Sequence, residues 1–331
     1  MENINYRIEH DLLGEREVPA DKYYGIHTLR ALENFPISGI PIQTYPGLID
    51  GLVYVKEACA LANLELGLLD KKHADAILQA CQEIRAGKYH SHFAVDVIQG
   101  GAGTSTNMNA NEVIANRALE ILGFERGNYK ELHPLEHVNM SQSTNDVYPT
   151  AVKVALRFEI ERLVNAMEVL RLDFDKKARE FSTVLKMGRT QLQDAVPMTL
   201  GQEFSTYAVM LMEDQQRLRE AALLIQEINL GATAIGTGIN APAEYAPLAC
   251  KALSELTGIQ FITADNLVEA TQDAGSFVQL SGVLKRVAVK LSKVCNDLRL
   301  LSSGPRAGFG EINLPPVQAG SSIMPGKVNP V

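Results

Sequence analysis

The sequence of 331 residues contains no uninterrupted apolar run long enough to cross a bilayer, and its N-terminus has neither the basic nor the apolar region of a signal peptide. Its four cysteines are scattered without any C-x-x-C spacing, at Cys59, Cys81, Cys250 and Cys295. The missing membrane segment predicts a soluble protein, and the cysteine pattern fits a reducing, cytoplasmic localisation.

An excess of positive charge is also missing, because the chain has 31 Lys and Arg residues against 39 Asp and Glu residues, which gives a formal net charge of -8. A protein that binds the phosphate backbone needs clustered Lys and Arg, so we expect no nucleic-acid partner. An anionic ligand would have to be attracted by local cations, and Arg189 and Lys327 are the candidates beside polar motifs. The hydrophobic content of 46% allows a large core, in two domains or one long helical body.

The spacing of apolar residues predicts a mainly α fold. Residues 1–145 combine short helical patterns with turn-rich connections, which indicates an N-terminal helical domain. Long helices separated by breaks at Gly231 and Gly304 follow, and we expect them at residues 146–181, 200–228 and 267–302. Each would be roughly 40 to 55 Å long. Such helices need partners along their whole surface, so residues 146–331 are expected to form a long-helix bundle or a subunit interface.

Three polar turns interrupt the helical patterns. The turn at residues 100–107 is no dinucleotide fingerprint, because Thr106 stands where the third glycine belongs. It remains either a loop that binds an anion at a helix N-terminus or a simple helix cap. Residues 141–146 form an unbroken polar run that capping explains only in part, so we favour a ligand role. The third turn, residues 188–194, would by itself be interpreted as a loop.

A fourth motif, GSSIMPGKVNP at residues 320–330, combines two hydroxyls, glycines, a cation and an amide. These groups can bind a carboxylate and remove a proton beside it. The motif is no P-loop, because five residues separate its glycines and Val328 follows Lys327, and Met324 excludes a nucleophile elbow. His133 and His137 have metal-like spacing, but Pro134 intervenes, and we expect surface or hydrogen-bonding histidines instead of a metal site.

The motif at residues 320–330 resembles the signature of the aspartase and fumarase superfamily. Other segments resemble family segments in the same order, at residues 23–30, 101–112, 137–146 and 188–194. Within the superfamily, residues 188–199 and 305–315 are similar to aspartate ammonia-lyases, and Gln191 stands where fumarases usually carry His. The resemblance implies reversible elimination of ammonia from L-aspartate to give fumarate.

The resemblance also implies roles for individual residues. Ser321 would be the general base, acting as an alkoxide on the way to an aci-carboxylate intermediate. Stabilising that intermediate would provide most of the catalysis, since the proton removed is only weakly acidic. The β-carboxylate would be bound by Thr104, Ser143, Thr144 and Ser322, the α-carboxylate by Thr190, Lys327 and Asn329, and the amino group by Asn145 with Gln191 as a neighbour.

For the assembly, the resemblance implies a homotetramer with a central helical bundle and active sites built from three chains. No cofactor is expected to be required, and a divalent cation would at most be an activator. Family members continue with more bundle helices and a small C-terminal domain. By that comparison the 146–331 domain is expected to be incomplete and the C-terminal domain absent. Two alternatives stay open: a fumarate hydratase or another lyase of the superfamily, and an inactive helical fragment that only self-assembles.

Overall fold

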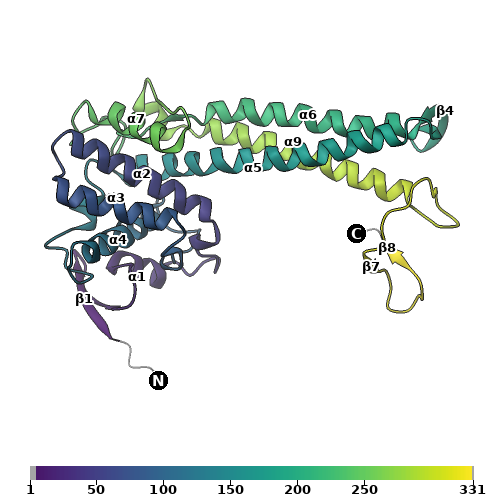
Figure 1. The fold of residues 1–331 in the computed structure, drawn as a ribbon. Helices are drawn as coiled ribbons and strands as arrows, with labels where there is room; N and C mark the ends of the chain where they lie inside the picture. Colours follow the sequence, from purple (N-terminus) through teal and green to yellow (C-terminus); the bar gives the residue numbers. More distant parts are fainter. Residues whose placement is uncertain (1–4, 330–331) are drawn as a thin grey trace. The chain divides into compact units, whose positions relative to one another are not determined.

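The computed structural model describes residues 5–329 and has a mainly helical fold, as the sequence predicted (Figure 1). Pro330, which ends the GSSIMPGKVNP motif, lies outside the described residues. The chain divides into two compact units. The first comprises the described residues up to Glu159 together with Leu223–Ala274, and the second comprises Ile160–Ala222 and the described residues from Gly275 onward. The predicted division at residue 145 treated each domain as one continuous stretch, whereas the first unit takes a second segment of the chain.

The first unit begins with an antiparallel hairpin of β1 (Tyr6–Asp11) and β2 (Gly14–Pro19). Four helices follow, α1 (Ile26–Asn34), α2 (Pro46–Glu65), α3 (Lys71–Arg85) and α4 (Thr104–Ile121), with short 3-10 turns at Ile42–Thr44 and His90–His92. A π-helical turn at Pro134–Val138 precedes the start of α5 (Thr144–Glu180). The returning segment supplies β5 (Glu227–Ile228), α7 (Tyr245–Thr257), β6 (Ile262–Thr263) and α8 (Leu267–Gln272).

Helix α2 lies at the centre of this unit and packs against α3, α4 and α7. Its sequence is apolar on all sides, which is typical of a helix that is surrounded by others. It also crosses α5 at close range, because a Cβ atom at Gly51 would lie 2.3 Å from the carbonyl oxygen of Ala151. The core that results holds the start of α5, and thus the polar turn before it, in place.

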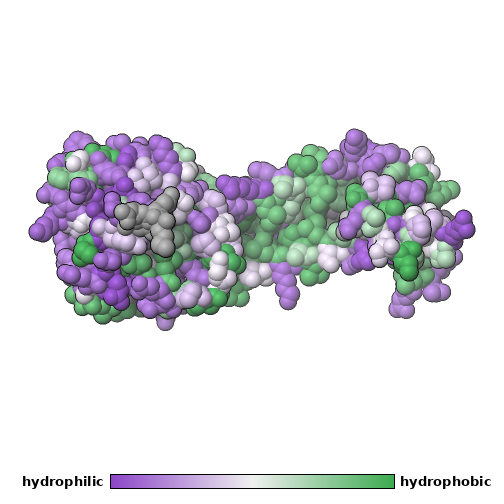
Figure 2. All heavy atoms as spheres, turned by 90° about the horizontal axis from the view of Figure 1, so that it is seen from below, coloured by the Kyte–Doolittle hydropathy of each residue, from purple (hydrophilic) through white to green (hydrophobic). Residues whose placement is uncertain are grey.

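The second unit contains the rest of α5, the hairpin of β3 (Leu185–Thr190) and β4 (Gln193–Thr199), α6 (Leu200–Leu224), α9 (Gly275–Leu301), and β7 (Gln318–Ala319) with β8 (Val328–Asn329). The long helices run side by side (Figure 1), and their core is formed by Leu200, Phe204, Tyr207 and Val294. Many apolar side chains remain exposed, and Figure 2 shows hydrophobic residues gathered over the long helices. No helix among residues 5–329 is long and apolar enough to span a membrane.

The first predicted long helix is confirmed, but the other two were too long. Helix α6 ends at Leu224 instead of residue 228, because Glu227 and Ile228 pair in parallel with Ile262 and Thr263. The predicted helix at 267–302 is two helices, α8 and α9, because the backbone adopts an extended conformation at Asp273 (ψ 132°) before α9 begins.

Candidate active site

The polar turn at residues 141–146 is fixed by Asp146, whose side chain is completely buried. Its Oδ1 accepts the backbone N–H of Ser143 at 2.9 Å, and its Oδ2 accepts those of Gly231 at 3.1 Å and Thr233 at 3.0 Å. Burial raises the pKa of Asp146 to about 6, although these N–H bonds partly oppose the shift. The carboxyl group therefore joins the turn to the loop that follows β5.

A buried polar network supports the same turn from behind. Lys56, in the middle of α2, is 0% exposed and donates to Asn139 Oδ1 and Gln142 Oε1, both at 2.8 Å. Burial lowers the pKa of Lys56 to about 7. Asn107 donates to Asn139 Oδ1 at 3.1 Å and to Thr144 Oγ1 at 3.2 Å. Because Thr144 accepts the Asn107 proton, its own hydroxyl hydrogen can donate to a ligand.

Sequence reasoning missed this support. A single lysine within the apolar run of residues 52–62 was the one signal for it, because a charged side chain inside a helix that is apolar on all sides must find polar partners. Its partner Asn139, and Asn107, which donates to the same Asn139 oxygen, lie within segments that resemble the family but were not predicted to have a role.

The neighbouring residues line two cavities of this unit. Ser143 lines a cavity of about 520 Å³, and its Oγ also accepts the Asn145 N–H at 3.2 Å, so capping explains part of its environment. Asn145 lines a second cavity, of about 630 Å³, with Tyr148 and Gly103. Its Nδ2 donates to the carbonyl oxygen of Ala234 at 2.7 Å, which leaves Oδ1 as the atom suited to an ammonium group.

Thr104 is the first residue of α4 and is exposed. Gly103 is the N-cap and has a φ of 92°, and the N–H of Thr106 is accepted by Gln99 Oε1 at 2.9 Å. Among residues 100–107, no Thr or Ser side chain caps the helix; the first-turn N–H is accepted by Gln99 instead. The Thr104 hydroxyl lies at a helix N-terminus, where an anion is favoured.

The third polar turn forms the tip of the β3–β4 hairpin. Thr190 ends β3, and Gln191 and Leu192 form a two-residue turn with φ values of 50° and 65°. Both Thr190 and Gln191 are exposed. Arg189 is not the free local cation that we expected, because its Nη2 lies 2.5 Å from Glu311 Oε1 and its guanidinium stacks on the Phe309 ring.

The signature motif folds into its own hairpin, with Gln318 paired to Asn329 and Ala319 to Val328. Within the loop, Ser321 Oγ accepts the backbone N–H groups of Ile323 at 3.1 Å and Met324 at 3.0 Å. Two N–H groups aimed at one oxygen stabilise negative charge on it. Ser321 is half-buried, whereas Ser322 is exposed.

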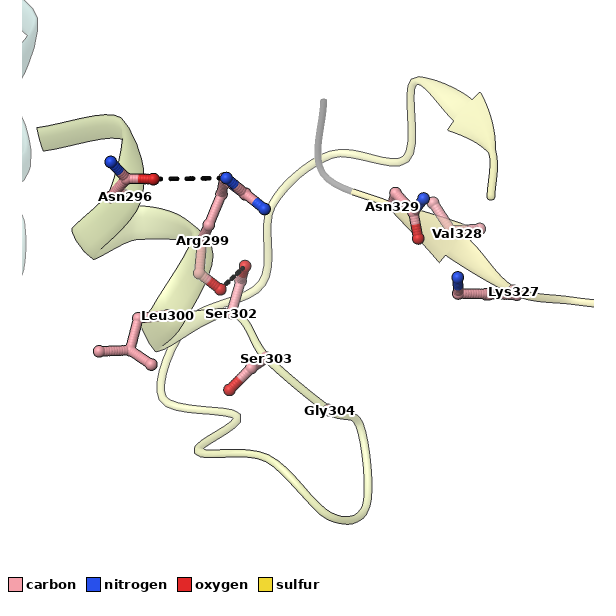
Figure 3. Close-up of a pocket in the computed structure, with 9 residues that line it drawn as sticks. All are labelled: Asn296, Arg299, Leu300, Ser302, Ser303, Gly304, Lys327, Val328 and Asn329. Atoms are coloured by element: carbon pink, nitrogen blue, oxygen red, sulfur yellow. Dashed lines mark hydrogen bonds between the residues drawn. The ribbon is translucent and has the colours of Figure 1, made fainter. Parts of the chain in front are cut away.

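Lys327 and Asn329 belong to the closing strand of this hairpin. Lys327 Nζ lies 3.4 Å and Asn329 Nδ2 3.5 Å from the carbonyl oxygen of Gly320, so both donors reach the same point beside Ser321. They also line a cavity of about 910 Å³, across from Arg299 at the end of α9 (Figure 3). A cation and an amide on one wall of a cavity are suited to a carboxylate.

The predicted site residues therefore form three groups. One group lies in the first unit at the starts of α4 and α5, and consists of Thr104, Ser143, Thr144 and Asn145. The other two belong to the second unit, with Thr190 and Gln191 on one hairpin and with Ser321, Ser322, Lys327 and Asn329 on the other. Neither unit contains all of the predicted site residues.

The two histidines are hydrogen-bonding residues, as expected. His137 Nδ1 accepts the backbone N–H of His133 at 2.9 Å, and His133 Nδ1 accepts that of Leu135 at 3.1 Å. Among residues 5–329, no group of three or more His, Cys, Asp or Glu side chains is arranged to hold a metal ion.

Comparison with known proteins now defines the class. The profile of the family described as Lyase matches residues 14–331, and the chain belongs to this family, the aspartase/fumarase superfamily of lyases. The predicted resemblance is thereby confirmed. The chain is 58% identical over 328 residues to the aspartate ammonia-lyase of Escherichia coli (strain K12), covering 99% of this chain and 69% of the relative. It is 60% identical over 325 residues to the aspartate ammonia-lyase of Helicobacter pylori (strain ATCC 700392 / 26695), covering 98% and 69%.

Solved structures agree on the fold. A fumarate lyase:delta crystallin from Brucella melitensis, bound to cobalt, is 58% identical with a TM-score of 0.96, covering 98% of this chain and 71% of that one. A class II fumarase from Schistosoma mansoni is 36% identical with a TM-score of 0.93 over the same shares.

Proposed function

We propose that the protein is an aspartate ammonia-lyase, which reversibly eliminates ammonia from L-aspartate to give fumarate. The observation that carries the proposal is the identity of 58–60% to aspartate ammonia-lyases over nearly the whole chain, against 36% to a class II fumarase. Gln191, at the position where fumarases usually carry His, supports the same choice.

In the proposed reaction, Ser321 Oγ removes a proton from the carbon next to the β-carboxylate. The electron pair of that C–H bond moves into the carboxylate and forms the aci-carboxylate. When this intermediate collapses, the carbon–carbon double bond forms and the C–N bond breaks, which releases ammonia. The hydroxyl of an ordinary serine is too weak an acid to form the alkoxide that this role needs. The N–H groups of Ile323 and Met324, together with the charge of Lys327, are suited to stabilise that alkoxide.

Substrate binding follows from the donors available. The β-carboxylate gains charge in the intermediate, so hydroxyl donors from Thr104, Ser143, Thr144 and Ser322 would bind the transition state more tightly than the substrate. The support of Thr144 by Asn107 favours such a donor role. The α-carboxylate is assigned to Thr190, Lys327 and Asn329. Asn145 Oδ1 is assigned to the amino group, with Gln191 nearby.

We also propose a homotetramer in which three chains contribute to each active site. The exposed apolar side chains of the long helices support this assembly, including Val169, 64% exposed, and Val289, 60% exposed. No cofactor is proposed as required, and a divalent cation would act at most as an activator. The predicted localisation stays cytoplasmic, in keeping with the free thiols of all four cysteines.

The test incubates the purified chain separately with L-aspartate and L-malate and follows fumarate and ammonia. The Escherichia coli aspartate ammonia-lyase serves as the positive control. Fumarate and ammonia in equal amounts from L-aspartate are expected. Fumarate from L-malate alone would replace the proposal with a fumarate hydratase. No turnover of either substrate by an assembled protein would favour the inactive self-assembling fragment.

A further inference from the structure

A cluster of ion pairs joins the β3–β4 hairpin to the segment that follows α9. Glu311 Oε1 lies 2.5 Å from Arg189 Nη2, and its Oε2 lies 3.0 Å from Lys186 Nζ. Lys186 also pairs with Glu203 at the start of α6. The side chains are largely buried, with exposed fractions of 7% for Lys186, 17% for Glu311 and 19% for Arg189. One carboxylate thus contacts two cations of the same strand.

The backbone of Glu311 is hydrogen-bonded to the end of α9. Its N–H donates to the carbonyl oxygen of Leu301, the last residue of α9, at 2.9 Å. The next residue, Ile312, packs against the core of the second unit. Glu311 is therefore fixed to the end of a long helix.

The hairpin, by contrast, has little support of its own. An isolated two-stranded hairpin is marginally stable, and residues 193–197 of β4 are exposed. Its tip holds two non-glycine residues, Gln191 and Leu192, in the left-handed region. Without Glu311, Arg189 would keep the Phe309 ring beneath its guanidinium and, as an ionic partner, Asp194, whose carboxylate is 75% exposed and lies 3.8 Å from Nε. Partly buried charges that lose a partner destabilise their surroundings far more than exposed ones do.

We propose that Glu311 is a positioning residue for substrate binding, which fixes Thr190 and Gln191 at the hairpin tip by holding Arg189 and Lys186 of β3. The inference rests on the proposed function, in which Thr190 binds the α-carboxylate. Glu311 touches neither the substrate nor Ser321 in this scheme. A binding group must be held within about 0.5 Å of its productive position, and a hairpin released from Glu311 loses that precision.

The kinetic test uses Glu311→Gln, which keeps the shape of the side chain and removes its charge. Contacts to the α-carboxylate are made in the ground state and in the transition state, so their loss raises KM for L-aspartate by about tenfold while kcat stays within about twofold. Glu311→Asp keeps the charge and is expected to recover most of the lost affinity. The control is Glu220→Gln, which removes an exposed carboxylate paired with Arg217 on α6. It should change neither constant.

A second measurement does not depend on turnover. Hydrogen exchange of the amides in residues 189–194 is expected to be about tenfold faster in Glu311→Gln than in wild type, and unchanged in Glu220→Gln. Unchanged exchange in Glu311→Gln overturns the proposal, and so does a fall in kcat at constant KM. If the wild-type chain does not convert L-aspartate, the proposed function fails, and the exchange rates alone then decide whether Glu311 holds the hairpin.

Discussion

Ser321 has two neighbours that distinguish it from the adjacent Ser322. Its Oγ accepts N–H bonds from Ile323 and Met324, whereas Ser322 is exposed. If Ser321 is the base, Ser321→Ala should lower kcat by at least about a thousandfold and leave the oligomer intact. Ser322→Ala is the matched control and should lose only about tenfold to a hundredfold, because it removes one of several carboxylate donors. Steady-state kinetics with light scattering measure both, and substantial turnover by Ser321→Ala would exclude Ser321 as the base.

Asp146 makes the stability of the first unit depend on pH. Its pKa in the folded chain, about 6, lies above its ordinary value of 3.8, so folding favours the protonated form. The stabilisation is complete below pH 3.8 and is lost as the pH rises through about 6, a difference of about 3 kcal/mol. Asp146→Asn cannot titrate. Urea unfolding at pH 4 and pH 7 should show wild type losing most of this amount relative to the variant, about 2 kcal/mol, and parallel pH profiles would contradict the prediction.

At the residue level, the sequence was sufficient to predict the surroundings of a side chain whose hydrogen-bond partners lie in the same motif. The Ser321 loop makes its N–H bonds within four residues, so its motif contained the whole arrangement. Lys56 was missed because its partner Asn139 is 83 residues away in sequence. Arg189 was misjudged for the same reason, since Glu311 is separated from it by 122 residues.

Among the elements, α5 was predicted almost to its ends because its apolar spacing continues without interruption. The end of α6 was not, because residues after Leu224 pair with a strand that begins at Ile262. Pairing over such a distance leaves no local pattern. The sequence therefore predicts the ends of a helix well when an apolar face continues along its whole length. It predicts them poorly when the helix ends because a distant segment pairs with the residues that follow.

The crossing of α2 and α5 predicts a large effect from a single methyl group. Gly51→Ala would place Cβ 2.3 Å from the Ala151 carbonyl oxygen, so the two helices must move apart, at a cost of about 3 kcal/mol. Gly47→Ala, in the first turn of the same helix, would meet only the end of the Glu159 side chain, which can rotate away. Thermal unfolding should show a lower melting temperature for Gly51→Ala and an almost unchanged one for Gly47→Ala. Equal melting temperatures would mean that the helices cross less closely.

For the whole molecule, the sequence predicted two domains, but it did not predict that each domain is built from two separate segments of the chain. Residues 223–274 return to the first unit, where α7 packs on α2 and the loop after β5 binds Asp146. The predicted site residues are also divided between the two units. The presence of long helices was predicted correctly because helical periodicity is a local signal, although two of the three were predicted too long.

The proposed tetramer makes a prediction for α9. Leu280, Val287 and Val294 share one buried face of this helix, whereas Val278 and Val289 lie on the opposite face and are 69% and 60% exposed. Val289→Glu should therefore leave the fold of one chain unchanged. In an assembled bundle the same carboxylate would be buried without a partner, which weakens association by about a hundredfold.

Size-exclusion chromatography with light scattering measures the outcome. Wild type is expected to elute as a tetramer and Val289→Glu as smaller species with little activity, because each active site then lacks the motifs of its partner chains. The control is Leu68→Glu, which places the same charge at a residue of the first unit that is 43% exposed. It should stay tetrameric. A Val289→Glu variant of unchanged mass would mean that this face of α9 takes no part in assembly, and a monomeric, active wild type would exclude shared active sites.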